Sequence, residues 1–137
     1  MINIQKLYKK FILIRFLEEE IVKKYSEGKM RCPTHISIGQ EAISVAFSQV
    51  VDKKDFTIST HRPHAHYIAK GGNINSLVAE LYGKKTGCSM GKGGSMHLID
   101  LSVNFMGSSS ILGNNIPIGV GLGLSLNIKN KNNISYI

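Results

Sequence analysis

The sequence has few cysteines and no long apolar run, and each shortage excludes a class of protein. Its 137 residues include two cysteines, Cys32 and Cys88, with no C-x-x-C spacing. A disulfide framework and a structural zinc site with paired cysteines are therefore not expected. The most apolar run, residues 111–126, contains two asparagines and is shorter than the roughly 20 residues that a membrane span needs.

Acidic residues are also scarce, because 9 Asp and Glu face 17 Lys and Arg, for a formal net charge of +8. The basic residues are scattered along the chain and form no stripe with stacking aromatics, so a solvated basic surface is favoured over a nucleic-acid site. Lys9, Lys10 and Arg15 interrupt the first apolar residues, so no signal peptide is expected. We expect a cytoplasmic protein with no membrane or nucleic-acid partner.

The pattern along the chain alternates helices with short strands, which is typical of an α/β fold. We expect a single partial domain over residues 1–137, with helices packed on a short parallel sheet. We expect helices over residues 4 to about 25, about 42–50, 77–82 and from Gly113 onward, with strands or extended pieces at 56–60, 103–106 and 134–137. In the first helix, Glu19/Lys23 and Glu20/Lys24 could form i,i+4 ion pairs. Asn75 or Ser76 is expected to cap the helix over 77–82, Pro117 lies in the first turn of the last helix, and residues 134–137 look like the start of a buried strand. Gly119 and Gly123 share a face of the last helix, which would let another helix approach.

Residues 83–97 hold five glycines and three lysines and end at His97. Such a loop costs conformational entropy and suggests a nest of backbone N–H groups for an anion. The P-loop version of this idea fails, because Thr86 stands where the first glycine is required and Gly93 follows Lys92 in place of Ser or Thr.

Histidines gather after the first strand, in the run His61-Arg62-Pro63-His64-Ala65-His66. A metal site made from them is not favoured, because a structural zinc site uses four ligands in compact pairs and the sequence has no Cys pair. Two interpretations stay open from the residues alone. Arg62 with His35 and neighbouring histidines could donate to a phosphorylated ligand, or the histidines could be unrelated surface residues.

Four segments in this order and spacing resemble one family. They are His35-x-x-x-Gly39-Gln40-Glu41-Ala42, then Ser59-Thr60-His61-Arg62-x-His64-x-His66, then Gly91-Lys92-Gly93-Gly94-Ser95-Met96-His97, and finally Ile111-x-Gly113 with Pro117-x-Gly119. The combined pattern is similar to the alpha subunit of thiamine-diphosphate-dependent 2-oxo acid dehydrogenase complexes, in the pyruvate and acetoin branches. The resemblance covers nearly the whole chain.

The resemblance implies the fold, the cofactor and the site. It implies an incomplete thiamine-diphosphate-binding fold, with His35 and His64 as catalytic residues. His61 and Arg62 would bind the cofactor, and the backbone at Ser110 and Leu112 would hold its aminopyrimidine ring. The family expectation is thiamine diphosphate with Mg²⁺, decarboxylation of a 2-oxo acid and transfer of the acyl group to lipoyl.

The resemblance also implies partner subunits, and it shows where this sequence departs from the family pattern. A beta subunit would complete a hetero-oligomer, and a lipoyl acyltransferase would follow in the full complex. The family's Gly-Asp-Gly segment, which begins the magnesium and diphosphate motif, is expected directly after Ile137 and is not in this sequence. No metal ligands are therefore predicted, and the isolated chain is expected to bind cofactor weakly or not at all. The alternative function is a truncated, non-catalytic interaction module that pairs with a beta-like subunit.

Overall fold

The computed structural model describes residues 3–137 and contains five α-helices, one short 3₁₀ helix and three strands in that part of the chain. In chain order these are α1 (Ile4–Tyr25), α2 (Glu41–Phe47), β1 (Phe56–Ser59), α3 (His64–Lys70), α4 (Ile74–Leu81), the 3₁₀ helix η1 (Leu101–Val103), β2 (Phe105–Ser108), α5 (Asn115–Ile128) and β3 (Ser135–Tyr136). The predicted alternation of helices and strands is confirmed.

The three strands form one parallel sheet in the order β2-β1-β3. Ser59 at the end of β1 lies opposite Ser108 at the end of β2. Parallel strands end at the same edge of a sheet, so the loops that follow β1 and β2 emerge side by side. The α/β class with a short parallel sheet is confirmed by this topology.

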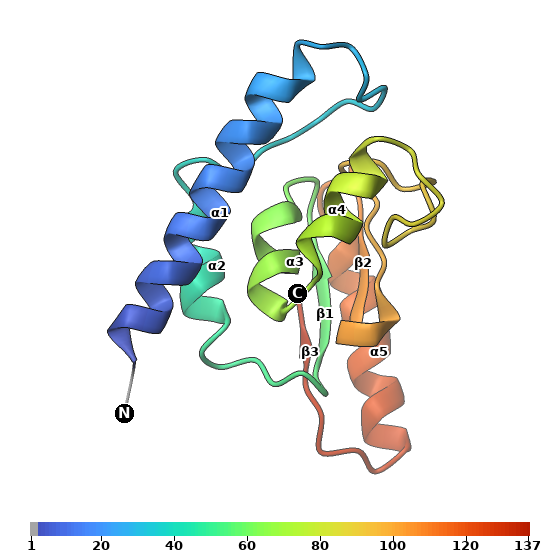
Figure 1. Ribbon diagram of the computed structural model, residues 1–137. Helices are drawn as coiled ribbons and strands as arrows, with labels where there is room; N and C mark the ends of the chain where they lie inside the picture. Colours follow the sequence, from blue (N-terminus) through green and yellow to red (C-terminus); the bar gives the residue numbers. More distant parts are fainter. Residues whose placement is uncertain (1–2) are drawn as a thin grey trace.

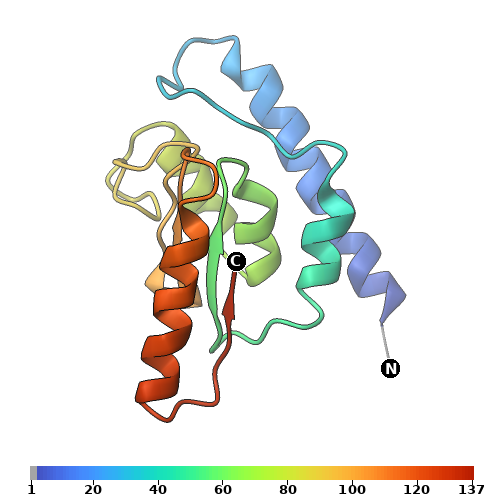
Figure 2. The same ribbon diagram turned by 180° about the vertical axis from the view of Figure 1, so that it is seen from behind.

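Helices cover both faces of the sheet (Figures 1 and 2). Helix α5 lies on one face, where it contacts β1 and β3. Helix α3 lies on the other face, and α2 and then α1 pack outside it. The main core lies on the α3 side and joins α1, α2, α3 and α4 to β2; its buried members are Ile14, Val45, Ala65, Tyr67, Ile68, Ala69, Leu77, Leu98 and Phe105.

The helix boundaries have clear local causes. Asn3 caps α1 by accepting the backbone N–H of Lys6 at 2.9 Å. Asn73 caps α4 by accepting the N–H of Ser76 at 3.1 Å, so the predicted cap at Asn75 or Ser76 is wrong. An extended residue directly before the first turn is required for this bond, and Asn73 has that conformation, whereas residues 75 and 76 are already helical.

The predicted ion pairs of α1 are also wrong in their spacing. Lys23 binds Glu20 at 2.6 Å, three residues away, and Lys24 binds Glu27 beyond the helix end at 2.8 Å. Both spacings are within reach on a helix surface, and pairs this exposed contribute little stability.

Glycines on α5 face the last strand and not another helix. A Cβ on Gly119 would overlap the side chain of Ile137, and one on Gly123 would lie 3.6 Å from Cβ of Ser135. The predicted close approach is therefore real, but its partner is β3. The hydroxyl of Ser135 donates to the carbonyl of Gly119 at 2.9 Å, which fixes the contact.

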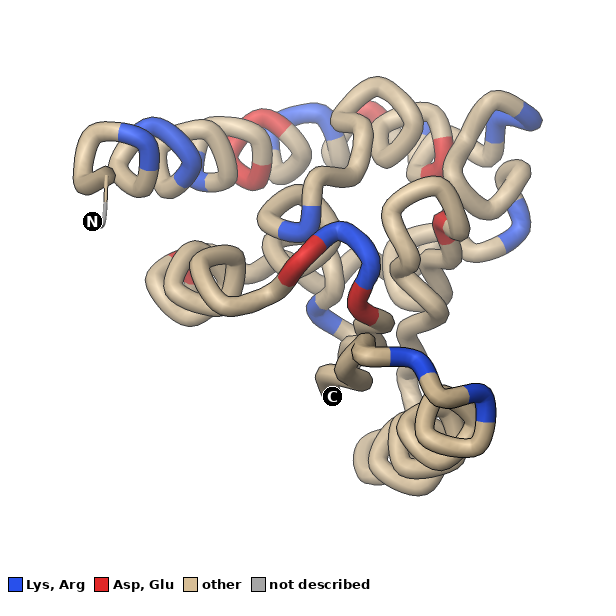
Figure 3. The backbone as a smooth tube through the Cα atoms, turned by 90° about the horizontal axis from the view of Figure 1, so that it is seen from below, with Lys and Arg blue, Asp and Glu red and all other residues tan. Residues whose placement is uncertain are grey.

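Charges are spread over several segments in the described chain, and α5 carries none (Figure 3). Over residues 3–137, none of the helices combines the length and the apolar character that crossing a membrane requires.

His66 gives the fold a predictable response to pH. Its Nδ1 lies 3.0 Å from the hydroxyl of Ser59, which ties α3 to β1, and burial lowers the pKa of the imidazole. Below the ordinary histidine pKa, about 6.5, the unfolded chain takes up a proton that the folded chain resists. Stability is therefore present above about pH 6.5 and is lost as the pH falls below it.

We predict that His66→Asn, which keeps a hydrogen-bonding atom near Nδ1, makes the free energy of unfolding less dependent on pH between 7 and 5. Urea unfolding at a series of pH values measures this slope. His97→Asn is the matched control, because His97 is exposed. An unchanged slope in His66→Asn, or an equal change in both variants, would contradict the prediction.

Candidate functional site

The loops that follow β1 and β2 bring the predicted site residues to one edge of the sheet. After Ser59 the chain enters the turn with His61 and Arg62, and after Ser108 it enters the turn that contains Ser110 and Leu112. The N–H of Ser109 donates to the carbonyl of Ser59 at 3.3 Å, which holds the two turns together. Ligands commonly bind at the carboxyl ends of parallel strands, so this edge is the candidate site.

His35 reaches this edge from the loop between α1 and α2. Its ring lies 5.2 Å from the ring of His61, centroid to centroid, in an edge-to-face arrangement. Nδ1 of each ring is buried and has no hydrogen-bond partner among the described residues. A buried polar atom without a partner is costly, so both rings are held at an energetic cost. Each residue is half-buried, so part of the histidine pair is open at this edge.

Arg62 is half-buried next to the same loop. Its guanidinium donates to the carbonyl of Ile36, and its own carbonyl accepts the hydroxyl of Ser37 at 3.3 Å. Arg62 thus holds the loop that carries His35, and its guanidinium places a fixed positive charge at the carbonyl of Ile36, the residue after His35. Guanidinium groups suit phosphates because they present several donors in one plane.

His64 lies deeper than the other predicted site residues and is fully buried. Nδ1 is 3.0 Å from a carboxylate oxygen of Glu18, and Nε2 is 3.0 Å from the hydroxyl of Ser95. Both ring nitrogens are therefore occupied within the protein. The sequence reading missed Glu18 and Ser95, although Glu18 stands in the buried stripe of α1 between Ile14 and Ile21.

Ser110 and Leu112 are exposed at the edge. The turn is shaped by the N–H of Ile111, which donates to the hydroxyl of Ser109 at 3.2 Å. Next to it, the amide of Asn115 donates to the carbonyl of Ser59 at 2.8 Å and anchors the start of α5 below the turn. The backbone at these two positions is accessible to a ligand.

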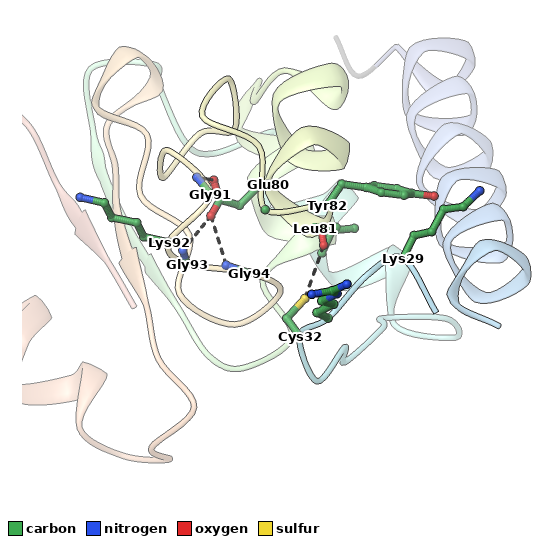
Figure 4. Close-up of a pocket in the computed structure, with 11 residues that line it drawn as sticks. Lys29, Cys32, Glu80, Leu81, Tyr82, Gly91, Lys92, Gly93 and Gly94 are labelled. Carbon is green, nitrogen blue, oxygen red and sulfur yellow. Dashed lines mark hydrogen bonds between the residues drawn. The ribbon is translucent and has the colours of Figure 1, made fainter. Parts of the chain in front are cut away.

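The glycine-rich loop closes around a buried carboxylate (Figure 4). Glu80 on α4 is fully buried, and its two oxygens accept the backbone N–H groups of Ser89, Gly91, Gly93 and Gly94 at 2.7–3.1 Å. Four converging N–H groups form the anion nest that the composition suggested. The anion is the protein's own, so the loop is not a phosphate cradle.

The pocket in Figure 4 lies outside this loop, between it and residues 29–32, and measures about 460 Å³. Its cationic side chains include Lys29, which is also paired with Glu27 at 2.9 Å, and the exposed Lys92. The sulfur of Cys32 lies 3.8 Å from the carbonyl of Leu81 across the pocket. None of the predicted site residues lines it.

A third buried glutamate fixes the loop before α2. Glu41 accepts two hydrogen bonds from the guanidinium of Arg15, at 2.6 and 3.2 Å, and also the N–H of Gly39. The hydrogen bond from Arg15 lowers the pKa of the Glu41 carboxyl, and the same bond raises the pKa of Arg15. Glu41 stays ionised and joins α1 to the start of α2.

Across residues 3–137, His, Cys, Asp and Glu side chains form no group of three or more that could hold a metal ion. The buried acidic groups described above are each satisfied by N–H donors, histidine or arginine. The site at the sheet edge therefore offers imidazole and guanidinium groups and backbone, which suit an anionic or heteroaromatic ligand.

This fold is that of an α/β protein with a short parallel sheet, and its candidate ligand site lies at the carboxyl ends of the strands, near His35, His61 and Arg62. The comparison with known families is specific. The model of the family described as "Dehydrogenase E1 component" matches residues 9–137. The chain belongs to this family.

Individual relatives agree with the family. The chain is 42% identical over 131 residues to the pyruvate dehydrogenase E1 component subunit alpha of Rickettsia prowazekii, which is 96% of this chain and 40% of that protein. It is 40% identical over 112 residues to the subunit of that name from Porphyra purpurea, covering 82% of this chain and 33% of the relative. A chloroplastic alpha-3 subunit from Arabidopsis thaliana is 39% identical over 113 residues, with 82% and 26% covered. The chain thus spans 40% or less of these relatives.

We predict that Glu80→Gln lowers the free energy of unfolding by on the order of 3 kcal/mol, because an NH₂ group would then face backbone donors in a buried site. Urea unfolding measures the loss. Glu20→Gln is the control, since Glu20 is exposed on α1, and it should change little. Equal stability of the two variants would contradict the role given to Glu80.

A second prediction concerns the shape of the same loop. A Cβ on Gly93 would overlap the carbonyl oxygen of His97, whereas a Cβ on Gly121 of α5 meets nothing within 4 Å. Gly93→Ala should therefore cost about 2–3 kcal/mol. Gly121→Ala should stabilise by about 0.5–1 kcal/mol through helix propensity. Thermal unfolding of both variants checks the sign of each effect, and a Gly93→Ala protein as stable as wild type would contradict the packing described.

Proposed function

We propose that this chain is the N-terminal part of a thiamine-diphosphate-dependent 2-oxo acid dehydrogenase alpha subunit, with pyruvate as the substrate of the whole enzyme. The support is the family membership and the names of the relatives. The observation that carries the assignment of the site is the contact between the half-buried rings of His35 and His61 at the sheet edge, next to the loop that Arg62 holds. Family membership over residues 9–137 favours this function over a non-catalytic interaction module.

Each residue at the edge has a task in this proposal. Arg62 would contact the diphosphate, because it brings a permanent positive charge and a planar set of donors. His35 and His61 would present the exposed parts of their half-buried rings to the ligand. The accessible backbone at Ser110 and Leu112 would hold the aminopyrimidine ring. When bound, the cofactor supplies the carbanion-stabilising chemistry, and these residues orient it.

His64 has a different task from the one that the resemblance implied. It is fully buried, and both of its ring nitrogens are used by Glu18 and Ser95. A group that reacts with substrate must reach it. We therefore propose that His35 contacts the cofactor and substrate directly and that His64 acts through its neighbours.

The proposal extends to partners and metal. A beta subunit would complete the active site, and a lipoyl acyltransferase would receive the acyl group, as the resemblance implies. Mg²⁺ would accompany the diphosphate, held by oxygen ligands outside the set described above. The described residues thus supply one side of the cofactor site.

We predict weak and localised binding of thiamine diphosphate to this chain. In a ¹H–¹⁵N NMR titration with Mg²⁺ present, the backbone signals of His61, Arg62 and the 110–112 turn should shift at millimolar ligand. Arg62→Lys should reduce these shifts, because an ammonium cannot replace the planar fork. Lys92→Ala, which removes an exposed cation of the glycine loop, is the control and should leave them unchanged.

Two outcomes would contradict the proposed site. One is the absence of shifts at the sheet edge. The other is a set of shifts spread over exposed lysines and reproduced in full by inorganic diphosphate, which would indicate charge attraction alone.

A further inference from the structure

Three side chains from distant parts of the sequence form a buried line of hydrogen bonds. Glu18 of α1 lies 3.0 Å from Nδ1 of His64, which opens α3, and Nε2 of His64 lies 3.0 Å from the hydroxyl of Ser95 in the glycine-rich loop. All three residues are at most 1% exposed. We call this line the buried relay.

The outer ends of the buried relay fix a loop. The hydroxyl of Ser95 accepts the N–H of His35 at 3.1 Å, and the second carboxylate oxygen of Glu18 accepts the N–H of Ser37 at 3.1 Å. The carbonyl of Ile36, between them, accepts the guanidinium of Arg62. Each residue from His35 to Ser37, outside any helix or strand, therefore makes a backbone hydrogen bond to a side chain. The ring of His35, the first of the three, contacts the ring of His61.

Donor and acceptor counting sets the direction of the protons. The N–H of His35 can only donate, so the oxygen of Ser95 accepts it. The hydroxyl hydrogen of Ser95 then has Nε2 of His64 as its acceptor, which requires that Nε2 carry no proton. Hydrogen-bond counting then leaves the ring proton of His64 on Nδ1, from which it is donated to the carboxyl oxygen of Glu18. A doubly protonated His64 would leave the hydroxyl hydrogen of Ser95 without an acceptor among the described groups.

The order acid, imidazole, hydroxyl is also found in hydrolytic triads, but the geometry does not support that chemistry here. Ser95 is 1% exposed, so no substrate carbonyl can reach its oxygen. Its lone pairs face the N–H of His35 and not an open site. The buried relay therefore acts on the protein's own backbone.

We propose that Glu18, His64 and Ser95 are positioning residues that hold the backbone at His35 and thereby keep its ring in contact with the ring of His61. This inference rests on the proposed function for the identity of the ligand. The relay itself is a property of the ligand-free chain. Binding groups that the fold already holds in place lose less conformational entropy when a ligand binds, so they bind and orient it more effectively.

The first test uses the unmodified chain. Long-range ¹H–¹⁵N NMR of the histidine rings reports the protonation of each nitrogen at neutral pH. We expect a neutral His64 ring with its proton on Nδ1. A proton on Nε2, alone or together with Nδ1, would overturn the direction assigned to the relay.

The second test compares two serines of the same loop. Ser95→Ala removes the hydroxyl that holds His35, whereas Ser89→Ala removes one that binds Ile99 and His97 at the other side of the loop. We expect the nuclear Overhauser contacts between the rings of His35 and His61 to be lost in Ser95→Ala and kept in Ser89→Ala. If Ser95→Ala does not fold, Ser95→Cys, which fills the same space with a weak acceptor, is measured in its place.

Ring contacts that persist in the folded Ser95 variant would overturn the proposal. For binding, we expect the dissociation constant of thiamine diphosphate to rise about tenfold in Ser95→Ala. A change of this size corresponds to the net contribution of one hydrogen bond, here the bond that positions His35. Ser89→Ala should bind as wild type, and an equal loss in both variants would show a general loop effect and overturn the specific role. If wild type itself does not respond to the cofactor, the proposed function fails, while the ring contacts still decide the role of the relay.

Discussion

The carboxylate of Glu80 lies within the protein and out of contact with water, and the arrangement of the site depends on how its charge is satisfied. A buried carboxylate is stable only when donors replace its hydration. Here four backbone N–H groups do so, and they converge because glycines allow the chain to fold tightly around the oxygens. Ser95 follows the last of these donors directly. The position of its hydroxyl, and with it the anchor of His35, is therefore set by a carboxylate on α4.

The same solution appears at two other buried glutamates. Glu18 accepts His64 and the N–H of Ser37, and Glu41 accepts Arg15 and the N–H of Gly39. Each carboxylate joins a helix to a loop. A small sheet with short strands leaves much of the backbone in loops. Glutamate side chains on the helices accept hydrogen bonds from these loops, which would otherwise bond to water.

Sequence periodicity predicted most of the helices and strands because burial of apolar side chains decides them, as in α1 and β1. Helix α3 was not among the expected elements, because the histidine run that opens it carries no apolar periodicity. Periodicity could not predict which charged residues are buried or which groups they contact. The composition of the glycine loop predicted a nest for an anion but not that the anion is the side chain of Glu80. The carboxylate and its N–H donors lie 9 to 14 residues apart and meet only in the folded chain. The edge residues were predicted as a group through the resemblance, since no periodicity marks His35 as a neighbour of His61.

The unpartnered Nδ1 atoms of His35 and His61 follow from this rigidity. In a flexible loop, a histidine ring would turn until its nitrogen found water or a carbonyl. The loop from His35 to Ser37 is held at each residue, so this relaxation is restricted. The free energy forfeited by a buried nitrogen without a partner is about 1–3 kcal/mol. The hydrogen bonds that hold the loop therefore oppose this cost, and they keep the two rings together at the sheet edge where the proposed ligand would bind.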